Sequence, residues 1–522
     1  MLKKLHGRKL AVCLIGGAMY ALFSAFGWQA EHGGVIWAGG ALLVAALLVW
    51  PIAALLAVLL ERGYTRALRR EKTFRAGRAF AFILACYVPM FCVAFPGSFA
   101  YDVPYQLRQV VTGAYSTHHP LLHTLALGGL LQLGRALGDI NLGAALYTAL
   151  QMALLAGCFA LTCGSIARQS GARAAKRAAV FFALYPLNMV MAVNATKDVL
   201  FGGFFALTLA LLNEIQEKPS RGLALKIAAC GALAVMLRNN MAYAALVWLA
   251  LLTLGLRKGE KSAALAMLLA LTVGLCGNAA LKRATRAESG DMSEMLSWPI
   301  QQLARARLYD EERLTDAEKE AIDELMPGEA WACYDPTISD PVKFEFDTQA
   351  FRADVKKYVG VWLSVGKKCA GTYLDATMAL TYPFFYPYRE YRVSGYYVQM
   401  GMSDAYDAGW CDFDPPESRS LFPRALASLS WRFGAKGAMQ IPVVGWLFNM
   451  GVIVWTMLFF ALREMYWGRW RRFGTALLPV LLWGTFLLGP VMAGRYIYPF
   501  VCALPVLAAR PGRSVKEAER HG

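Results

Sequence analysis

The stretch 96–122 reads PGSFAYDVPYQLRQVVTGAYSTHHPLL and lies between two hydrophobic segments of the chain. Asp102 follows the first segment by only a few residues, and the letters HHPLLH begin a new helix pattern at the other end. A carboxylate in this position can act as a general base near an incoming hydroxyl. The alternative is a loop carboxylate or a turn before Pro104. The side chains expected to contact a substrate flank Asp102: Tyr105, Gln106, His118 and His119.

The composition points to a membrane protein. Hydrophobic residues make up 57% of the 522 residues, and the mean hydropathy is +0.39. Soluble domains contain about 45–50% apolar residues. Many apolar runs carry no charge and are long enough to cross a hydrocarbon core of roughly 30 Å. We therefore predict an all-α polytopic membrane protein with about twelve transmembrane helices.

The formal net charge of +17 fits the same class of protein. In a soluble protein this charge would suggest nucleic acid, but here the Lys and Arg residues cluster in short loops between apolar runs, as the positive-inside rule predicts. We therefore expect a membrane, and no nucleic acid, as a partner. Cys333, Cys369 and Cys411 lie in the one long polar region, where at most one disulfide can form and the pairing stays open.

The basic loops predict the topology. The N-terminus and residues 61–78 are rich in Lys and Arg and are expected in the cytoplasm, with Asp102 on the outer face. Two apolar stretches, 121–137 and 142–166, precede the basic segment 168–177, and only a single crossing keeps that segment inside. We therefore predict that 121–137 is a helix on the outer surface. The expected crossings are 10–28, 35–60, 79–95, 142–166, 178–193, 199–212, 223–237, 241–256, 263–281 and 439–462, with two more flanking Gly494 and Arg495.

This pattern divides the chain into four parts and places both termini in the cytoplasm. Residues 1–78 are a two-span extension with a basic loop, and 79–281 are a membrane core that includes the outer loop 96–141. Residues 282–436 are a small extracytoplasmic α-rich domain, and 437–522 are a C-terminal three-span bundle with a cytoplasmic tail.

The outer domain carries helix signals of its own. Thr315 and Glu318 match a capping box, and apolar residues at helical spacing predict an amphipathic helix over 348–367. The run 382–397 is rich in Tyr and Phe. These rings could stack on a sugar, belong to an aromatic belt or fill the core of the domain.

Four polar clusters fall at the outer ends of the expected spans: Asp102 with His118 and His119, Lys197 with Asp198, Arg238 with Asn239 and Asn240, and Arg495 with Tyr496. Ionisable residues at membrane depth are costly and tend to be functional. Lys197, Arg238 and Arg495 are candidates for phosphate binding. For both arginines the alternative is an interfacial side chain that reaches into water. Asp198 would orient the phosphate or an acceptor, or alternatively cap its helix.

A metal site is the weaker interpretation of the histidines. His119 and His123 are four residues apart and share a helical face, a spacing that can bind Zn²⁺, but no adjacent Glu completes a protease motif. An interfacial or substrate-contacting role fits both side chains better. We therefore expect no cofactor, with a divalent metal ion as the less favoured alternative.

The order of these features resembles the GT-C superfamily of integral-membrane glycosyltransferases, which includes protein O-mannosyltransferases and the lipid A aminoarabinose transferase. The family pattern is an Asp in the first large outer loop, an HPPL-type surface helix, and a span that ends in a basic inside loop. Asp102, the letters HPLL from His119 and the run 142–166 match it in this order. Here two spans precede the catalytic-loop span, and no second acidic residue stands beside Asp102. A bacterial branch of the superfamily is matched more closely, through PGSFAYDVPYQL (96–107), HHPLLHTL (118–125), ATKDVLF (195–201), LRNN (237–240), SWPIQQLAR (297–305) and GRYIYP (494–499).

The resemblance implies transfer of a sugar from a polyprenyl-phosphate donor to a glycan or lipid acceptor on the outer face. Asp102 and Asp198 would be the catalytic residues, with Asp102 as the base, and a single base implies inversion at the anomeric carbon. Substrate contacts would come from Tyr105, Gln106, His118, His119, Lys197, Arg238, Asn239, Arg495 and Tyr496. The competing class is a transporter or flippase, but the sequence has no visible internal repeat and its charges sit at span ends. A structural envelope protein is the third class, and it would not need polar clusters on one face.

Overall fold

The computed structural model describes residues 5–33, 40–62, 73–99, 102–253, 258–290, 292–388, 416–434 and 441–510 of the chain. Within these residues the chain is helical, and β pairing is limited to isolated bridges. The prediction of an all-α protein is therefore confirmed for the part of the chain that the structure describes.

Six helices of the described chain are long and apolar enough to cross a membrane. They are α1 (Arg8–Glu31), α2 (Gly40–Arg62), α3 (Ala76–Val93), α6 (Ile140–Ser170), α9 (Lys197–Glu217) and α12 (Lys258–Thr285). These helices are compatible with a multi-pass membrane protein. A total of about twelve crossings stays a prediction.

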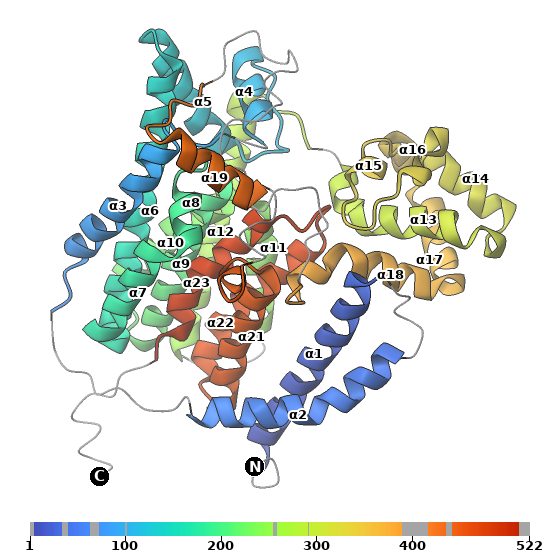
Figure 1. Cartoon of the computed structure of the whole chain (residues 1–522), viewed down its shortest axis with the longest axis horizontal. Helices are drawn as coiled ribbons and strands as arrows, with labels where there is room; N and C mark the ends of the chain where they lie inside the picture. The colour runs from blue at the N-terminus through green and yellow to red at the C-terminus, as the bar shows by residue number, and fades with distance from the viewer. Residues whose placement is uncertain are drawn as a thin grey trace.

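Helix α9 forms the centre of the bundle (Figure 1). Nearly all of its residues are buried, and it packs against α6, α10 and α23. A helix that is apolar all round is buried in a large core, so α9 holds the residues at its start, Lys197 and Asp198, in a packed environment. The shorter helices around it are α7 (Ala172–Leu184), α8 (Pro186–Ala192), α10 (Arg221–Leu237), α11 (Asn239–Thr253), α21 (Met450–Tyr466), α22 (Trp470–Leu487) and α23 (Tyr498–Ala508).

The bundle has two chemically different ends. At one of them, called the basic end below, Glu61 accepts hydrogen bonds from Lys9 at 2.6 Å and from Tyr466 at 2.8 Å, and Arg168 pairs with Glu214. Hydrogen bonds across this end join α22 to α6 and α9, from Arg472 to Gln169 and from Arg471 to Gln216. The described basic residues Lys9, Arg168, Arg471 and Arg472, which the charge pattern groups on one side, therefore do lie at one end.

Helix α5 (Leu121–Ala136) has both of its ends at the opposite end of the bundle. It begins just after His119, whose Nδ1 lies 3.8 Å from Asp102. After α5 ends, the chain reaches Asp139, whose carboxylate pairs at 3.0 Å with Arg419. The backbone N–H of Arg419 in turn donates to the carbonyl of Phe95, just after α3. This is the geometry expected of a helix that does not cross, and α6 alone continues to the basic end (Figure 1).

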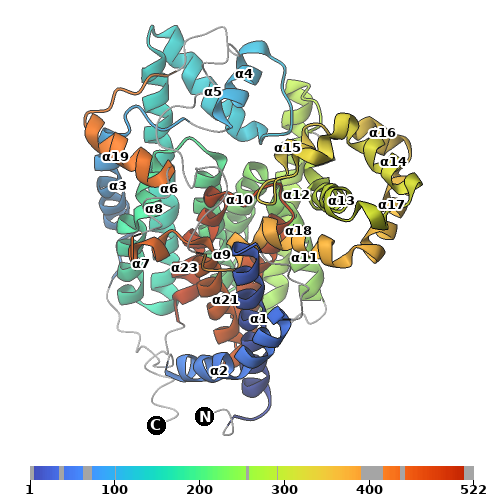
Figure 2. The ribbon, with the colours of Figure 1, turned by 45° about the vertical axis from the view of Figure 1, so that its right-hand side comes forward.

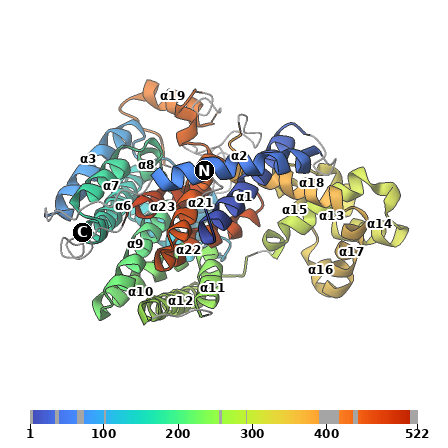
Figure 3. The same ribbon diagram turned by 90° about the horizontal axis from the view of Figure 1, so that it is seen from below.

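A helical domain lies to one side of the bundle, as Figures 2 and 3 show. Its own hydrophobic core includes Ile300, Ile322 and Val365, and Trp298 Nε1 joins it to the bundle by donating to the carbonyl of Leu487 at 2.7 Å. The predicted capping box at the start of α14 is confirmed. The helices of this domain are α13 (Ser297–Tyr309), α14 (Asp316–Leu325), α15 (Asp340–Lys343), α16 (Thr348–Ala353), α17 (Val355–Lys368) and α18 (Ala370–Thr381).

Two predicted helices are interrupted, so each single-helix prediction is wrong at one point. The expected span 178–193 breaks between α7 and α8 at Tyr185, which is extended (φ −66°, ψ 121°). Proline lacks an N–H and disfavours a helical residue before it, and Pro186 follows. The expected helix 348–367 breaks at Asp354, whose carboxylate accepts the backbone N–H of Lys357 and so starts α17 as a new helix.

Other expectations are modified or lie outside the described residues. Helix α2 runs across the lower part of the bundle in Figures 1 and 2, so the second expected span is inclined to the others. Cys333 and Cys369 are free thiols. Cys411 and the part 389–397 of the Tyr- and Phe-rich run lie outside the described residues.

Candidate functional site

Asp102 stands at the start of α4 (Val103–Thr112) with its carboxylate directed at cations from distant parts of the chain. Pro104 fits the first turn of this helix, where no N–H is needed. The side chain of Asp102 makes no capping bond to its own helix. Instead, Oδ2 accepts from Lys197 Nζ at 2.7 Å and Oδ1 accepts from Arg495 Nη2 at 3.1 Å. The carboxylate is thus held by two charged donors.

The two acidic residues of the cluster have separate partners. Asp198 is fully buried in the first turn of α9, where a negative charge also suits the helix dipole. It forms an ion pair with Arg238 Nη1 and lies 3.7 Å from Arg495 Nε. The helix cap is Thr196, whose hydroxyl accepts the backbone N–H of Asp198. The interpretation of Asp198 as the cap is therefore wrong, since its carboxylate is committed to Arg238.

Arg238 is buried where α10 gives way to α11. Its guanidinium carbon lies 4.5 Å from the ring centre of Tyr496 and 4.4 Å from that of Phe486, within the range of cation–π attraction. Only 9% of its side chain is exposed, and its Nε has no hydrogen-bond partner. The alternative of an interfacial arginine that reaches into water does not fit this burial.

The cluster carries a surplus of positive charge. Lys197, Arg238 and Arg495 face the carboxylates of Asp102 and Asp198, which leaves three cations against two anions. We call these five residues the charged cluster. Such a surplus in a largely dehydrated site favours binding of an anion.

Burial and neighbouring charges decide the protonation of the side chains in the outer loop. Burial alone would raise the pKa of Asp102, but Arg495 and Lys197 hold the pKa of this carboxyl well below its usual range. Burial lowers the pKa of His119 to about 3, with a smaller opposing effect from Asp102. Asp102 is therefore ionised and His119 neutral at neutral pH, so His119 adds no charge to the surplus.

A second network of hydrogen-bonded polar side chains connects the helices next to the charged cluster. Both ring nitrogens of His123 in α5 make hydrogen bonds. Nδ1 lies 2.9 Å from the side-chain amide nitrogen of Gln106, and Nε2 lies 2.9 Å from the hydroxyl of Tyr147. Tyr147 donates to Gln151 at 3.0 Å, and Gln151 donates to the carbonyl of Asn194 at 2.8 Å, just before α9. The network links α4, α5 and α6 to the segment that carries Lys197. Sequence reasoning missed Tyr147 and Gln151, although polar residues four apart in an apolar span were the available signal.

The structure brings some of the predicted residues together and leaves others apart. Asp102, Lys197, Asp198, Arg238, Arg495, His119 and Tyr496 meet in one place. Gln106 is 1% exposed and belongs to the second network. His118 and Tyr105 are exposed beside His119, with ring centres 4.6 and 6.4 Å from its ring. Asn239 is exposed. Neighbouring Asn240 bonds to Thr485 at 3.2 Å.

Among the described ranges, no group of three or more His, Cys, Asp or Glu side chains is arranged to hold a metal ion. Asp102 and His119 are the only acid and histidine of the outer loop that approach each other in the described chain, and the acid is already bonded to two cations.

The described chain is an α-helical bundle, compatible with a multi-pass membrane protein, that has a buried ionic site at one end. Residues 112–521 match the family described as "Family of unknown function (DUF6020)", and the chain belongs to this family. The matched region includes Lys197, Asp198, Arg238 and Arg495, whereas Asp102 lies before it. No curated protein and no solved structure matches the chain.

Proposed function

We propose that this protein is a membrane glycosyltransferase of the GT-C type that moves a sugar from a polyprenyl-phosphate donor to a hydroxyl of a glycan or lipid acceptor. The observation that carries the proposal is the convergence of Asp102, Lys197, Asp198, Arg238 and Arg495. These residues come from the starts of α4 and α9, the end of α10 and the segment before α23. Packing alone does not require ionisable residues from four segments to meet at the end of an apolar bundle.

The donor phosphate is proposed to bind Lys197 and Arg495. Both side chains are mostly buried, with 14% and 11% exposure, and both are charged donors of the kind that recognise phosphate. In the free protein they bond to the carboxylate of Asp102 at 2.7 and 3.1 Å. A phosphate that enters between them competes with Asp102 for the same donors.

This competition would turn Asp102 into an effective base. With both cations bound to it, Asp102 has a low pKa and is a poor proton acceptor. When the phosphate takes over Lys197 and Arg495, the pKa of Asp102 rises towards the range in which a carboxylate assists proton removal. Donor binding and base activation are thereby coupled, and the acceptor is deprotonated only when a donor is present.

The proposed reaction is a single displacement. Asp102 accepts the proton of the acceptor hydroxyl as that oxygen bonds to the anomeric carbon of the sugar. The bond from this carbon to the phosphate oxygen breaks, and its electron pair leaves with the polyprenyl phosphate. Lys197 and Arg495 stabilise the negative charge on the leaving phosphate. Attack opposite to the phosphate inverts the anomeric configuration.

The remaining residues have supporting roles in this proposal. Asp198 holds Arg495 in place and is itself held by its ion pair with Arg238. His118 and Tyr105 stand exposed beside His119 and are suited to contact an acceptor. With the basic end in the cytoplasm, the charged cluster faces the outer side, and the donor lipid and the acceptor meet there.

The test is sugar transfer by the purified protein in nanodiscs that contain a polyprenyl-phosphate sugar. Asp102→Asn retains the shape and removes the proton acceptor, so turnover is expected to fall by about 10²–10⁴-fold. Asp316→Asn is the matched control, because that carboxylate is fully exposed on α14. Donor binding by Asp102→Asn should persist, since the change removes a negative charge that competes with phosphate. Normal turnover in this variant would refute the base, and absence of transfer by the unmodified protein with transport of the lipid would indicate a flippase.

A further inference from the structure

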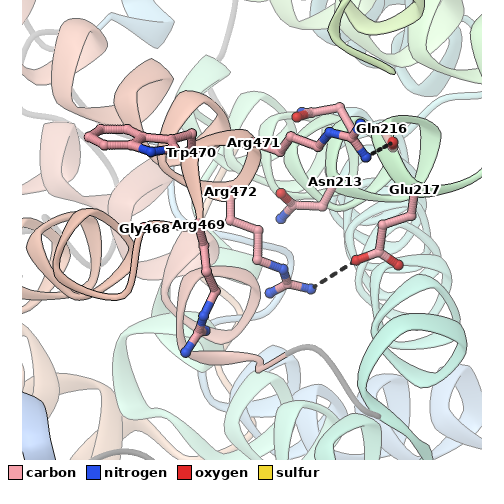
Figure 4. A pocket seen from close by; sticks show the side chains of 8 residues that line it. All are labelled: Asn213, Gln216, Glu217, Gly468, Arg469, Trp470, Arg471 and Arg472. Carbon is pink, nitrogen blue, oxygen red and sulfur yellow. Dashed lines mark hydrogen bonds and ion pairs between the residues drawn. The ribbon is translucent and has the colours of Figure 1, made fainter. Parts of the chain in front are cut away.

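A second polar site lies at the basic end, far from the charged cluster. A pocket of about 310 Å³ opens between the last turn of α9 and the start of α22. Figure 4 shows three arginines along it, Arg469, Arg471 and Arg472, with Trp470, Asn213 and Glu217. The proposed sugar transfer has no use for this pocket.

The turn before α22 concentrates the arginines. Gly468 has φ +66°, a left-handed conformation that suits glycine, and it reverses the chain between α21 and α22. A Cβ at this position would lie 2.7 Å from the guanidinium of Arg8, so the glycine also leaves room for a fourth arginine beside the pocket. Three guanidinium groups from the start of α22 therefore line the pocket, and a fourth, from α1, lies beside Gly468.

The charge of the pocket is positive, and existing partners do not cancel it. Glu217 lies 3.8 Å from Arg472 and is the single carboxylate that lines the described pocket. Arg469 pairs at 3.2 Å with Glu464, which Arg463 also contacts. Arg471 is exposed, and its guanidinium donates to a neutral backbone carbonyl, that of Gln216, at 3.2 Å.

Two buried polar atoms of the pocket lack partners. Arg472 has 10% of its side chain exposed, and its Nε makes no hydrogen bond, although its other nitrogens bond to Gln169 and to the carbonyl of Ala509. Asn213 is 7% exposed, and its side-chain oxygen has no donor. A guanidinium N–H needs an acceptor, and an amide oxygen needs a hydroxyl or amine donor. Such unmet bonds are costly when buried, and a ligand can satisfy them.

The N-terminus of α22, which lines the pocket, also favours an anionic ligand. α22 begins at Trp470, and its N-cap, Arg469, makes no side-chain cap bond. The first N–H groups of a helix carry partial positive charge and bind phosphate readily. Trp470 is 40% exposed, as expected of an aromatic side chain at a membrane interface.

We propose that this pocket binds a phosphate group that carries a hydroxyl-bearing substituent, with the headgroup of an anionic phospholipid such as phosphatidylglycerol as its source. The arginines and the start of α22 contact the phosphate, and Asn213 accepts from a headgroup hydroxyl. The position fits a lipid, because the ends of the apolar helices lie at headgroup depth, where basic pockets between helices bind anionic lipids. The inference does not depend on sugar transfer.

The experiment is native mass spectrometry of the delipidated full-length protein titrated with phosphatidylglycerol or phosphatidylcholine. Phosphatidylglycerol should bind at least about tenfold more tightly. Arg471→Gln should lower its affinity about tenfold, the value of one charge-assisted hydrogen bond. Arg177→Gln is the control, because it removes an exposed positive charge on α7, outside the pocket, and should change the affinity less than about twofold.

Two further arms separate the sources of the phosphate. Asn213→Leu should reduce the preference for phosphatidylglycerol over phosphatidic acid, which lacks the headgroup hydroxyls. Displacement of the lipid by millimolar glycerol phosphate or inorganic phosphate would support the phosphate site with a soluble ligand, whereas resistance to both would support the lipid. Equal binding of both lipids without competition by phosphate would overturn the proposal. So would Arg471→Gln and Arg472→Gln variants that behave like Arg177→Gln.

Discussion

The buried pair of Asp198 and Arg238 permits a quantitative test of how the charged cluster is built. Asp198→Asn keeps the size of the side chain and removes its charge. A residue that only caps a helix contributes about 1 kcal/mol. In the structure Asp198 is fully buried, and its loss leaves Arg238 with 9% exposure and no carboxylate partner. Breaking a buried pair in this way costs about 3–5 kcal/mol, so this loss in the free energy of unfolding is expected.

The assay is unfolding of the purified protein by sodium dodecyl sulfate in mixed micelles, followed by circular dichroism. Asp139→Asn is the matched control, because Asn caps a helix about as well as Asp and Asp139 is 43% exposed, so the loss of its ion pair with Arg419 should cost less than about 1 kcal/mol. The double variant Asp198→Asn with Arg238→Met removes both charges and should be more stable than the sum of the single changes predicts. A loss for Asp198→Asn no larger than that for Asp139→Asn would refute the buried pair.

Three other outcomes are expected. Arg495→Ala should weaken donor use by roughly 1.5–3 kcal/mol in a donor-binding assay, and Arg495→Lys should recover only part because Lys lacks the fork; an unchanged affinity would exclude Arg495 from the phosphate site. A cysteine at position 320, exposed on α14, in a chain from which the native cysteines are removed, should react with an impermeant maleimide from outside whole cells. Labelling only after lysis would reverse the topology. Because His119 has a pKa of about 3 when folded and about 6.5 when unfolded, the unfolded chain binds an extra proton between these values. Stability should therefore fall as pH drops below about 6.5, by up to about 1.4 kcal/mol per pH unit for this group, and His119→Gln should flatten the dependence measured by detergent unfolding.

Much of the architecture was predictable from local patterns. Uncharged apolar runs predict helices that can cross a membrane, because a bilayer offers backbone groups no other partner. The basic loops predict which segments share an end, and the structure joins those segments through ion pairs such as Lys9 with Glu61 and Arg168 with Glu214. The capping box of Thr315 and Glu318 was equally readable, since it depends on residues three apart.

The sequence predicted which residues form the site better than it predicted the contacts between them. The sequence indicated polar residues at span ends, and Asp102, Lys197, Arg238 and Arg495 do meet. It could not indicate that Arg238 pairs with Asp198. A carboxylate in the first turn of a helix has the same local pattern whether it caps the helix or neutralises a distant cation. Pro186 indicated the break of 178–193 at Tyr185, but the prediction of one continuous span followed the length of the apolar run and the loop charges instead.

The sequence by itself determined which segments are helical, which of them are apolar enough for a membrane and which loops share a side, because these properties depend on neighbouring residues and on the solvent around them. Only the tertiary structure decided the partners of the charges. Asp102 and Arg495 are separated by 393 residues in the chain and by 3.1 Å in space. The network through His123, Tyr147 and Gln151 likewise exists only because α5 packs on α6. Side-chain contacts of this kind depend on how whole helices pack, and no local pattern in the chain encodes that packing.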